Sequence, residues 1–156
     1  MRRPLVIPSA VFQKVQRGEA GLNEYIGLEP PELAAAAKVA ANLYEQGRAA
    51  EGRAVFEGII ALEPHFYLGY AGIGAIDLIE DRLDSALANL TRAATLNPGD
   101  ASVQINLGEV LLRNEEFAAA ALCLQNALAL HPSEEPLVAA RARVMLHAIE
   151  SLRSTA

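Results

Sequence analysis

A proline that recurs at a constant interval constrains the fold of this chain more than any other feature. Three lines fall into register, each ending on a proline at 64, 98 or 132, and Pro30 lies one further interval upstream; the lines are Ala61-Leu62-Glu63-Pro64, Thr95-Leu96-Asn97-Pro98 and Ala129-Leu130-His131-Pro132. The interval is 34 residues each time, and we call it the repeat length. A fixed period of this size indicates a supersecondary unit that buries its apolar face by stacking on copies of itself. A period of about 34 residues is typical of a helix–turn–helix unit.

Small residues follow the same period at the positions where two packed helices would cross. Helix axes approach to roughly 8–10 Å only when the side chains at the contact are small. The first helices carry Ala40, Gly74 and Gly108, and the second helices carry Gly52, Ala86 and Ala120. A second small position of the second helices holds Ala93 and Ala127, but Ile59 in the first repeat, and the large apolar residues between the two positions are Phe56, Leu90 and Leu124. The pattern predicts an all-α fold, an α-solenoid of three tetratricopeptide repeats (TPRs) with an N-terminal helical segment and a C-terminal capping helix.

The repeat frame also predicts the bounds of each element. Helix pairs are expected over 31–46 and 49–62, 65–79 and 82–96, and 100–113 and 116–130. Gly47 is expected to end the first helix in the left-handed conformation, and Asp100 to cap the fifth. A TPR domain then spans 31–152, with repeats over about 31–64, 65–98 and 99–132, and residues 1–30 form a partly helical segment with a short helix near 9–15.

The closing helix is expected over 135–152. Ser133 and Pro136 provide its start. A solenoid needs its last repeat covered, and five residues of this helix are predicted to do so: Leu137, Ala140, Val144, Leu146 and Ile149.

Composition and charge exclude several classes of function. The chain has a formal net charge of −6 and no Lys/Arg cluster, so nucleic acid is not expected as its main partner. Apolar runs are too short for a bilayer span. The start, Met1-Arg2-Arg3 with Pro4 and Pro8 after it, is a poor signal peptide, so we expect a cytoplasmic protein without membrane insertion.

No arrangement of reactive residues predicts an enzyme. Gly69, Gly72 and Gly74 lie inside a predicted helix without a preceding strand, which argues against a nucleotide-binding loop. The three histidines are far apart and lack metal-ligand spacing. Cys123 has no paired histidine in a recognisable motif and is interpreted as a small core residue. We therefore expect no catalytic activity, cofactor or metal.

Binding is the activity that the pattern favours. The first helices of stacked pairs line a concave face, and small residues with a few larger apolar ones there suit an extended peptide. For Ile79, Ile105 and Leu112 a position in the core fits equally well. The candidate peptide-binding residues are Ala37, Ala41, Tyr44, Leu68, Ala71, Gly72, Ala75, Leu78, Ile105, Asn106, Glu109 and Leu112.

Several stretches resemble a known family. They include Leu43-Tyr44-Glu45-Gln46-Gly47, the block from Phe66 to Ala75 (FYLGYAGIGA), Leu107-Gly108-Glu109-Val110-Leu111-Leu112, and the run from Ala142 to Ile149. With the chain length and the order of elements, the sequence resembles the class II chaperones of bacterial type III secretion systems. The resemblance implies a cytoplasmic chaperone that holds a proline- and leucine-containing segment of a hydrophobic translocator in its groove and keeps it soluble for export. It also implies a homodimer formed through the N-terminal portion, and a transcriptional activator as a further partner.

Two other binding functions are alternatives for a TPR fold. One is a general TPR adaptor in a bacterial pilus or envelope assembly complex. The other is a co-chaperone that grips a C-terminal carboxylate, which requires Lys, Arg and Asn donors converging from several repeats. The predicted inner faces are mostly Ala, Leu and Gly, which argues against the second.

Overall fold

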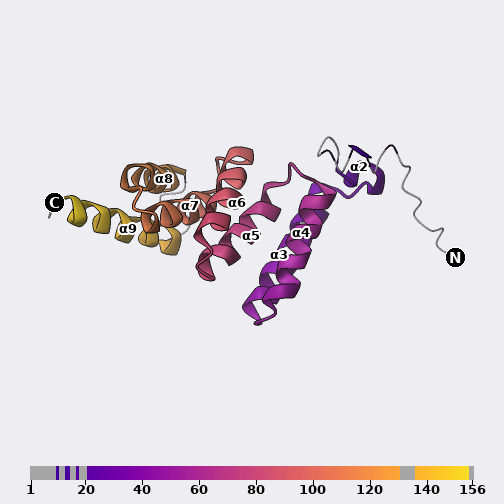
Figure 1. Ribbon diagram of the computed structural model, residues 1–156, viewed down its shortest axis with the longest axis horizontal. Coiled ribbons are helices and arrows are strands. Elements are labelled where there is room, and N and C mark those ends of the chain that lie inside the picture. The colour runs from indigo at the N-terminus through magenta and orange to yellow at the C-terminus, as the bar shows by residue number, and fades with distance from the viewer. Residues whose placement is uncertain (1–9, 11–12, 15–16, 18–20, 131–135, 155–156) are drawn as a thin grey trace. The chain divides into compact units, whose positions relative to one another are not determined.

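The computed structural model describes residues 10, 13–14, 17, 21–130 and 136–154, and these residues form helices joined by turns, with no strand. The predicted all-α TPR fold is confirmed, and the helices from α3 onward begin and end within two residues of the predicted bounds. The expected helix near 9–15 falls largely outside the described residues, as does Ser133. The helices are α2 (Asn23–Ile26), α3 (Pro30–Glu45), α4 (Ala49–Leu62), α5 (Tyr67–Ile79), α6 (Leu83–Leu96), α7 (Ala101–Arg113), α8 (Phe117–Leu130) and α9 (Pro136–Ser154) (Figure 1).

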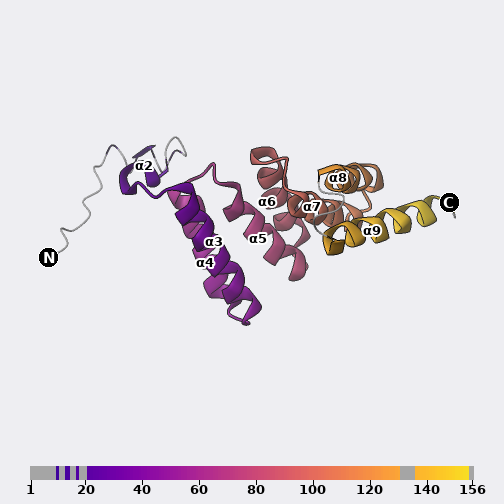
Figure 2. The same cartoon turned by 180° about the vertical axis from the view of Figure 1, so that it is seen from behind.

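The chain forms two compact units, residues 1–69 and residues 70–156. In the first unit α3 and α4 lie side by side as a hairpin, which Figures 1 and 2 show from opposite sides. Ala40 and Gly52 are both buried where the two helices cross. A Cβ on Gly52 would lie 2.6 Å from the Ala40 carbonyl oxygen, so this crossing requires glycine. Phe56 and Ile59 of α4 are buried and complete the core with Leu33 of α3.

In the second unit the helix pairs cross in the same way, but the glycine lies on the first helix of each pair and the alanine on the second, the reverse of Ala40 and Gly52. A Cβ on Gly74 would lie 2.6 Å from Leu90 Cγ, and a Cβ on Gly108 would lie 2.9 Å from Leu124 Cγ. Leu90 and Leu124 are completely buried. The predicted crossing positions are therefore confirmed in α5–α6 and in α7–α8.

A left-handed residue ends the first helix of every pair. Gly47, Asp81 and Glu115 occupy the same position in successive repeats and have φ values of 79°, 59° and 63°. In each turn the next amide N–H donates to a carbonyl oxygen five residues earlier, at 2.9, 2.8 and 2.8 Å. This pattern is a Schellman motif. The predicted role of Gly47 is confirmed, and so is the Asp100 cap, because its Oδ1 accepts from the Val103 N–H at 3.0 Å.

Glu115→Gly should therefore stabilise the protein by about 1 kcal/mol. A non-glycine residue in the left-handed region costs roughly 1–2 kcal/mol, and glycine avoids that cost at the expense of a more flexible unfolded chain. Gly47→Ala should have the opposite effect, since a side chain there enters the same strained region. Urea titrations followed by circular dichroism measure both changes. A lower midpoint for Glu115→Gly than for the wild type would contradict this explanation.

Near its C-terminal end, α5 contains a buried carboxylate that the sequence analysis does not predict. Asp77 is 0% exposed and occupies the position that Leu43 and Leu111 hold in the other two repeats. Arg82 Nε donates to Asp77 Oδ1 at 2.8 Å, and Ser85 Oγ donates to Asp77 Oδ2 at 2.6 Å. Donation to Asp77 raises the pKa of Arg82 above its ordinary value. Both carboxylate oxygens are thus satisfied, as burial of a charge requires.

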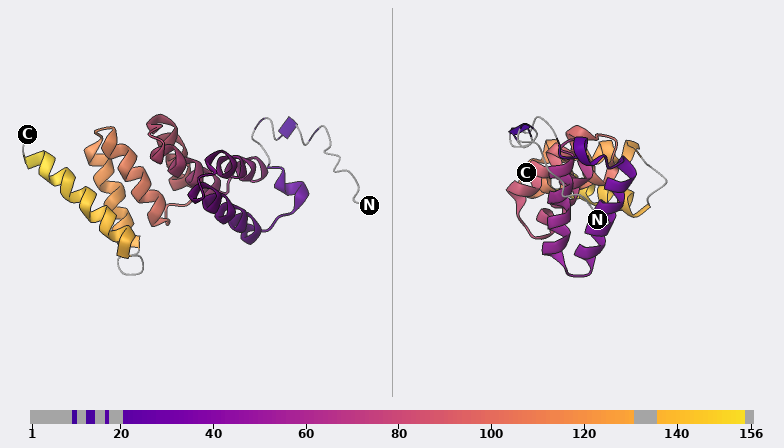
Figure 3. Two further views of the ribbon diagram at one scale, coloured as in Figure 1. Left: turned by 90° about the horizontal axis from the view of Figure 1, so that it is seen from below. Right: turned by 90° about the vertical axis from the view of Figure 1, so that its right-hand side faces the viewer.

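Helix α9 buries the residues that the repeat frame specifies, and three of the five residues predicted to cover the last repeat are not among them. Ala142 lies one repeat length after Gly108 and is completely buried, so α9 packs on α7 and α8 as the first helix of a fourth pair would (Figure 3, left). Ile149 is buried and Leu146 half-buried, as predicted. The prediction was wrong for Leu137, Ala140 and Val144, which are exposed. The buried stripe passes through the alanines at 139 and 142, because close helix contact there needs small residues.

Within the described part of the chain, no helix combines the length and apolar character needed to cross a lipid bilayer.

Candidate peptide-binding groove

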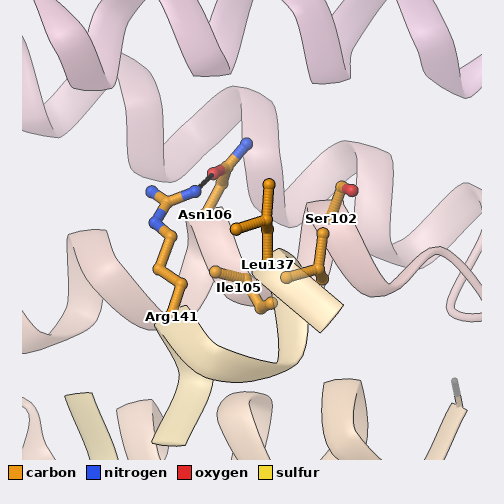
Figure 4. Close-up of a pocket in the computed structure, with 6 residues that line it drawn as sticks. Ser102, Ile105, Asn106, Leu137 and Arg141 are labelled. Atoms are coloured by element: carbon orange, nitrogen blue, oxygen red, sulfur yellow. Dashed lines mark hydrogen bonds between the residues drawn. The ribbon is translucent and has the colours of Figure 1, made fainter. Parts of the chain in front are cut away.

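Two hollows lie between α7 and α9 in the unit formed by residues 70–156. Arg141 lines both of them, and Figure 4 shows the first with Arg141 and Leu137 of α9 facing residues of α7. We call the two together the α7–α9 groove. It is lined by Ser102, Ile105, Asn106, Glu109, Leu112 and Arg113 of α7 and by Leu137, Val138, Arg141, Val144 and Met145 of α9.

Helical periodicity brings these residues to one surface. On α7 they recur at intervals of three and four, which is the spacing of one helix face, and the residues of α9 follow the same rule. Leu137 is 86% exposed and Val144 is 70% exposed, two turns further along α9. Large apolar side chains are left open to solvent along a groove, as they are at many protein interaction sites.

The centre of the groove is polar. Arg141 donates to Asn106 Oδ1 at 3.0 Å and, through its other terminal nitrogen, to Glu109 Oε2. Arg113 donates to Glu109 Oε1 at 2.6 Å, to the Leu78 carbonyl oxygen at 3.2 Å and to Asp81 Oδ1 at 3.3 Å. Two guanidinium groups from different helices therefore hold one carboxylate, whose side chain is only 18% exposed. Charge-assisted hydrogen bonds of this kind fix α9 in register on α7.

The structure brings four of the predicted residues of this unit together in the groove. Asn106, Glu109 and Leu112 are half-buried on its wall, and Ile105 lies beneath it, almost completely buried. Leu78 is 2% exposed and belongs to the core. A charged residue at this position would therefore disturb the fold. The other predicted residues of this unit lie half-buried on α5; they are Ala71, Gly72 and Ala75.

The remaining predicted residues belong to the unit formed by residues 1–69. Ala37 is buried in the α3–α4 core, whereas Ala41 is exposed on α3. Tyr44 and Leu68 are half-buried. Contact of these residues with a peptide remains a prediction.

Sequence reasoning missed the contribution of α9 to the groove. The sequence predicts that Leu137 and Val144 cover the last repeat, yet both line the hollows together with Arg141, which makes their central hydrogen bonds. One signal was present. The equivalent positions one and two repeats before Arg141 hold Leu107 and Ile73, both buried, so an arginine there departs from the repeat.

Reactive side chains give no sign of a chemical centre in the described residues. They include no group of three or more His, Cys, Asp or Glu that could hold a metal ion. Cys123 is half-buried in α8, and burial raises the pKa of its thiol. The thiol is therefore protonated at neutral pH and is a poor nucleophile.

Comparison with known proteins identifies the repeat and the fold. A family model described as tetratricopeptide repeat matches residues 77–146. A comparison with curated protein sequences gives no significant match. The fold of the chain is thus shown by its repeats and by the solved structures it resembles.

Three solved structures are similar over most of the chain. The Yersinia enterocolitica type III secretion chaperone SycD, solved with a peptide of the translocator YopD, is 23% identical over 79% of this chain and 95% of its own, with a TM-score of 0.68. PcrH, solved with the chaperone-binding region of PopD, is 22% identical over 81% of this chain and 97% of its own, with a TM-score of 0.69. A chain of a type III secretion complex from Aeromonas hydrophila is 20% identical over 96% of this chain and 100% of its own, with a TM-score of 0.75. The resemblance drawn from the sequence is confirmed at the level of the fold.

Proposed function

We propose that this TPR protein is a chaperone that binds an extended segment of a hydrophobic type III secretion translocator and keeps that client soluble for export. The observation that carries the proposal is the α7–α9 groove, with exposed Leu137 and Val144 on its wall. The fold that presents this groove is shared with SycD, solved with a peptide of the translocator YopD, and with PcrH, solved with the chaperone-binding region of PopD. We also propose that it acts in the cytoplasm, before export. A homodimer formed through residues 1–30 and binding of a transcriptional activator remain predictions.

The energetics fit a reversible clamp. Burying three apolar anchors in the groove would contribute roughly 1.5–3 kcal/mol each, or about 5–9 kcal/mol together. Ordering a flexible segment costs about 2–5 kcal/mol. Further contacts from the rest of the segment are needed to reach micromolar affinity. A client held in this way can be released when the secretion machinery engages it.

Co-expression tests the proposal. The hydrophobic translocator encoded in the same genome is expressed with and without the chain, and the translocator is followed in the soluble and insoluble fractions of both cultures. We expect the translocator to be soluble and to co-purify with the chain only when both are present. A translocator that stays insoluble in both cultures would show that it is not the client, and the chain would then need a different partner.

A further inference from the structure

Two arginines at the centre of the groove distinguish its chemistry. Among its lining residues are two arginines and one glutamate, in a chain whose formal net charge is −6. Asp81, which accepts from Arg113, lies outside this lining and its side chain is 77% exposed. Arg113 is paired with both Glu109 and Asp81, whereas among the described residues Arg141 has only the Glu109 carboxylate, which it shares with Arg113. Arg141 is therefore the less completely neutralised of the two guanidinium groups.

Arg141 is placed to meet a bound segment. Its side chain is 47% exposed, and it stands between the two hollows, with Leu137 on one side along α9 and Val144 on the other. The equivalent positions of the two preceding repeats hold buried Ile73 and Leu107, so packing of α9 does not call for an arginine here. The guanidinium group of Arg141 can bind both oxygens of a carboxylate at once, which selects for an acidic side chain. A backbone carbonyl of the peptide would give no such selection, because any donor can bind it.

The distance between the hollows sets the spacing of the ligand. Leu137 and Val144 are seven residues apart on α9, which corresponds to about 10 Å at the helical rise of 1.5 Å per residue. A peptide in the polyproline II conformation advances about 3.1 Å per residue and completes one turn every three residues. Two of its apolar side chains that are three positions apart therefore lie on the same face, about 9 Å apart, and would reach the two hollows. A long side chain between them would lie beside Arg141.

We propose that the bound segment carries an acidic side chain between two apolar anchors three positions apart, and that Arg141 is the residue that selects for it. This inference rests on the proposed function and specifies the chemistry of its client. The incoming carboxylate binds the guanidinium groups of Arg141 and Arg113 and competes with Glu109 for them. Glu109 thus holds the two arginines in place while the groove is empty.

A pair of synthetic peptides provides the test. Both are fluorescently labelled and have two leucines three positions apart in a glycine–serine context; one has glutamate immediately before the second leucine and the other has glutamine. Fluorescence anisotropy at low salt measures their affinities. We expect the glutamate peptide to bind the wild-type chain about fivefold more tightly, and the difference to shrink as salt screens the partly exposed pair.

Three variants separate selection by Arg141 from a merely structural role. Arg141→Gln should abolish the preference for the glutamate peptide, and Glu109→Gln should strengthen binding of that peptide by about two- to threefold because it removes the competing carboxylate. Arg143→Gln is the matched control, since Arg143 is an exposed arginine of the same helix outside the groove lining, and it should leave the preference unchanged. Circular dichroism verifies that each variant is folded.

Several results would overturn the inference. They are equal affinity of the two peptides for the wild type, a preference that survives in Arg141→Gln, and the absence of saturable binding of either peptide. Each of these leaves the co-expression result intact, because that result depends on the client being held and not on the residue that selects it. Failure of co-expression together with a glutamate preference would instead retain Arg141 as the selecting residue and replace the client.

Discussion

Replacing Gly108 with valine should destabilise the unit formed by residues 70–156 by about 3 kcal/mol, at the upper end of the cost of overpacking a core. A Cβ at this position would lie 2.9 Å from both Cγ and Cδ2 of Leu124 and 3.4 Å from the Ala120 carbonyl oxygen. Leu124 is completely buried in the core. Because α7 and α8 can accommodate the new side chain only by separating, the cost falls on the packing of the whole hairpin.

Gly58→Ala is the matched control for this substitution. Gly58 also lies inside a helix, α4, but nothing is within 4 Å of the position that its Cβ would take. Alanine is better than glycine in a helix by about 1 kcal/mol, so this variant should be stabilised by roughly that amount. The two variants are compared with the wild type by urea denaturation. A Gly108→Val midpoint equal to that of the wild type would show that close approach of α7 and α8 is not needed.

The double variant Leu137→Asp/Val144→Asp should reduce affinity for the client by more than about 100-fold. Each side chain is an apolar anchor on the groove wall, and losing two of them removes roughly 3–6 kcal/mol of burial, before the cost of desolvating the new carboxylates is added. Both side chains are largely exposed, so the fold should tolerate aspartate at these positions. Loss of co-purification with retained helicity is the expected result.

Leu122→Asp controls for the general effect of removing an exposed leucine. Leu122 is 59% exposed on α8 and does not line the α7–α9 groove. This variant should bind the client as the wild type does. If the double variant also binds normally, the binding surface lies elsewhere, and Tyr44→Glu in α3 then becomes the decisive substitution for the predicted residues of the first unit.

The fold could be predicted closely because the repeat presents most positions three times. The prolines, the small residues at the helix crossings and the large apolar residues between them each recur once per repeat, so one repeat corrects the interpretation of another. The predicted bounds of the helices from α3 onward agree with the structure to within two residues. Physical requirements that are shared by all repeats, such as close helix contact, are therefore visible in the sequence.

Features that occur once could not be predicted in this way. Arg141 donates hydrogen bonds to Asn106, 35 residues earlier in the chain, and to Glu109, 32 residues earlier, and no periodic pattern predicts either contact. Leu137 and Val144 were assigned to covering the last repeat because apolar residues usually pack against something, whereas the alanines of α9 make that contact. The groove thus depends on departures from the repeat, which the period alone does not reveal.

The buried Asp77 has a consequence for how the chain avoids pairing the wrong helices while it folds. Successive hairpins of similar sequence offer each helix several near-equivalent partners, and shape alone distinguishes them poorly. In the native pairing, Asp77 receives a cation and a hydroxyl from Arg82 and Ser85. If α8 and the turn before it packed on α5 in place of α6, Glu116 would replace Arg82 and Ala119 would replace Ser85. The buried carboxylate of Asp77 would then face a second negative charge without access to water. Asp77 therefore disfavours the pairing of α5 with α8 and helps to fix the order in which the helices pack.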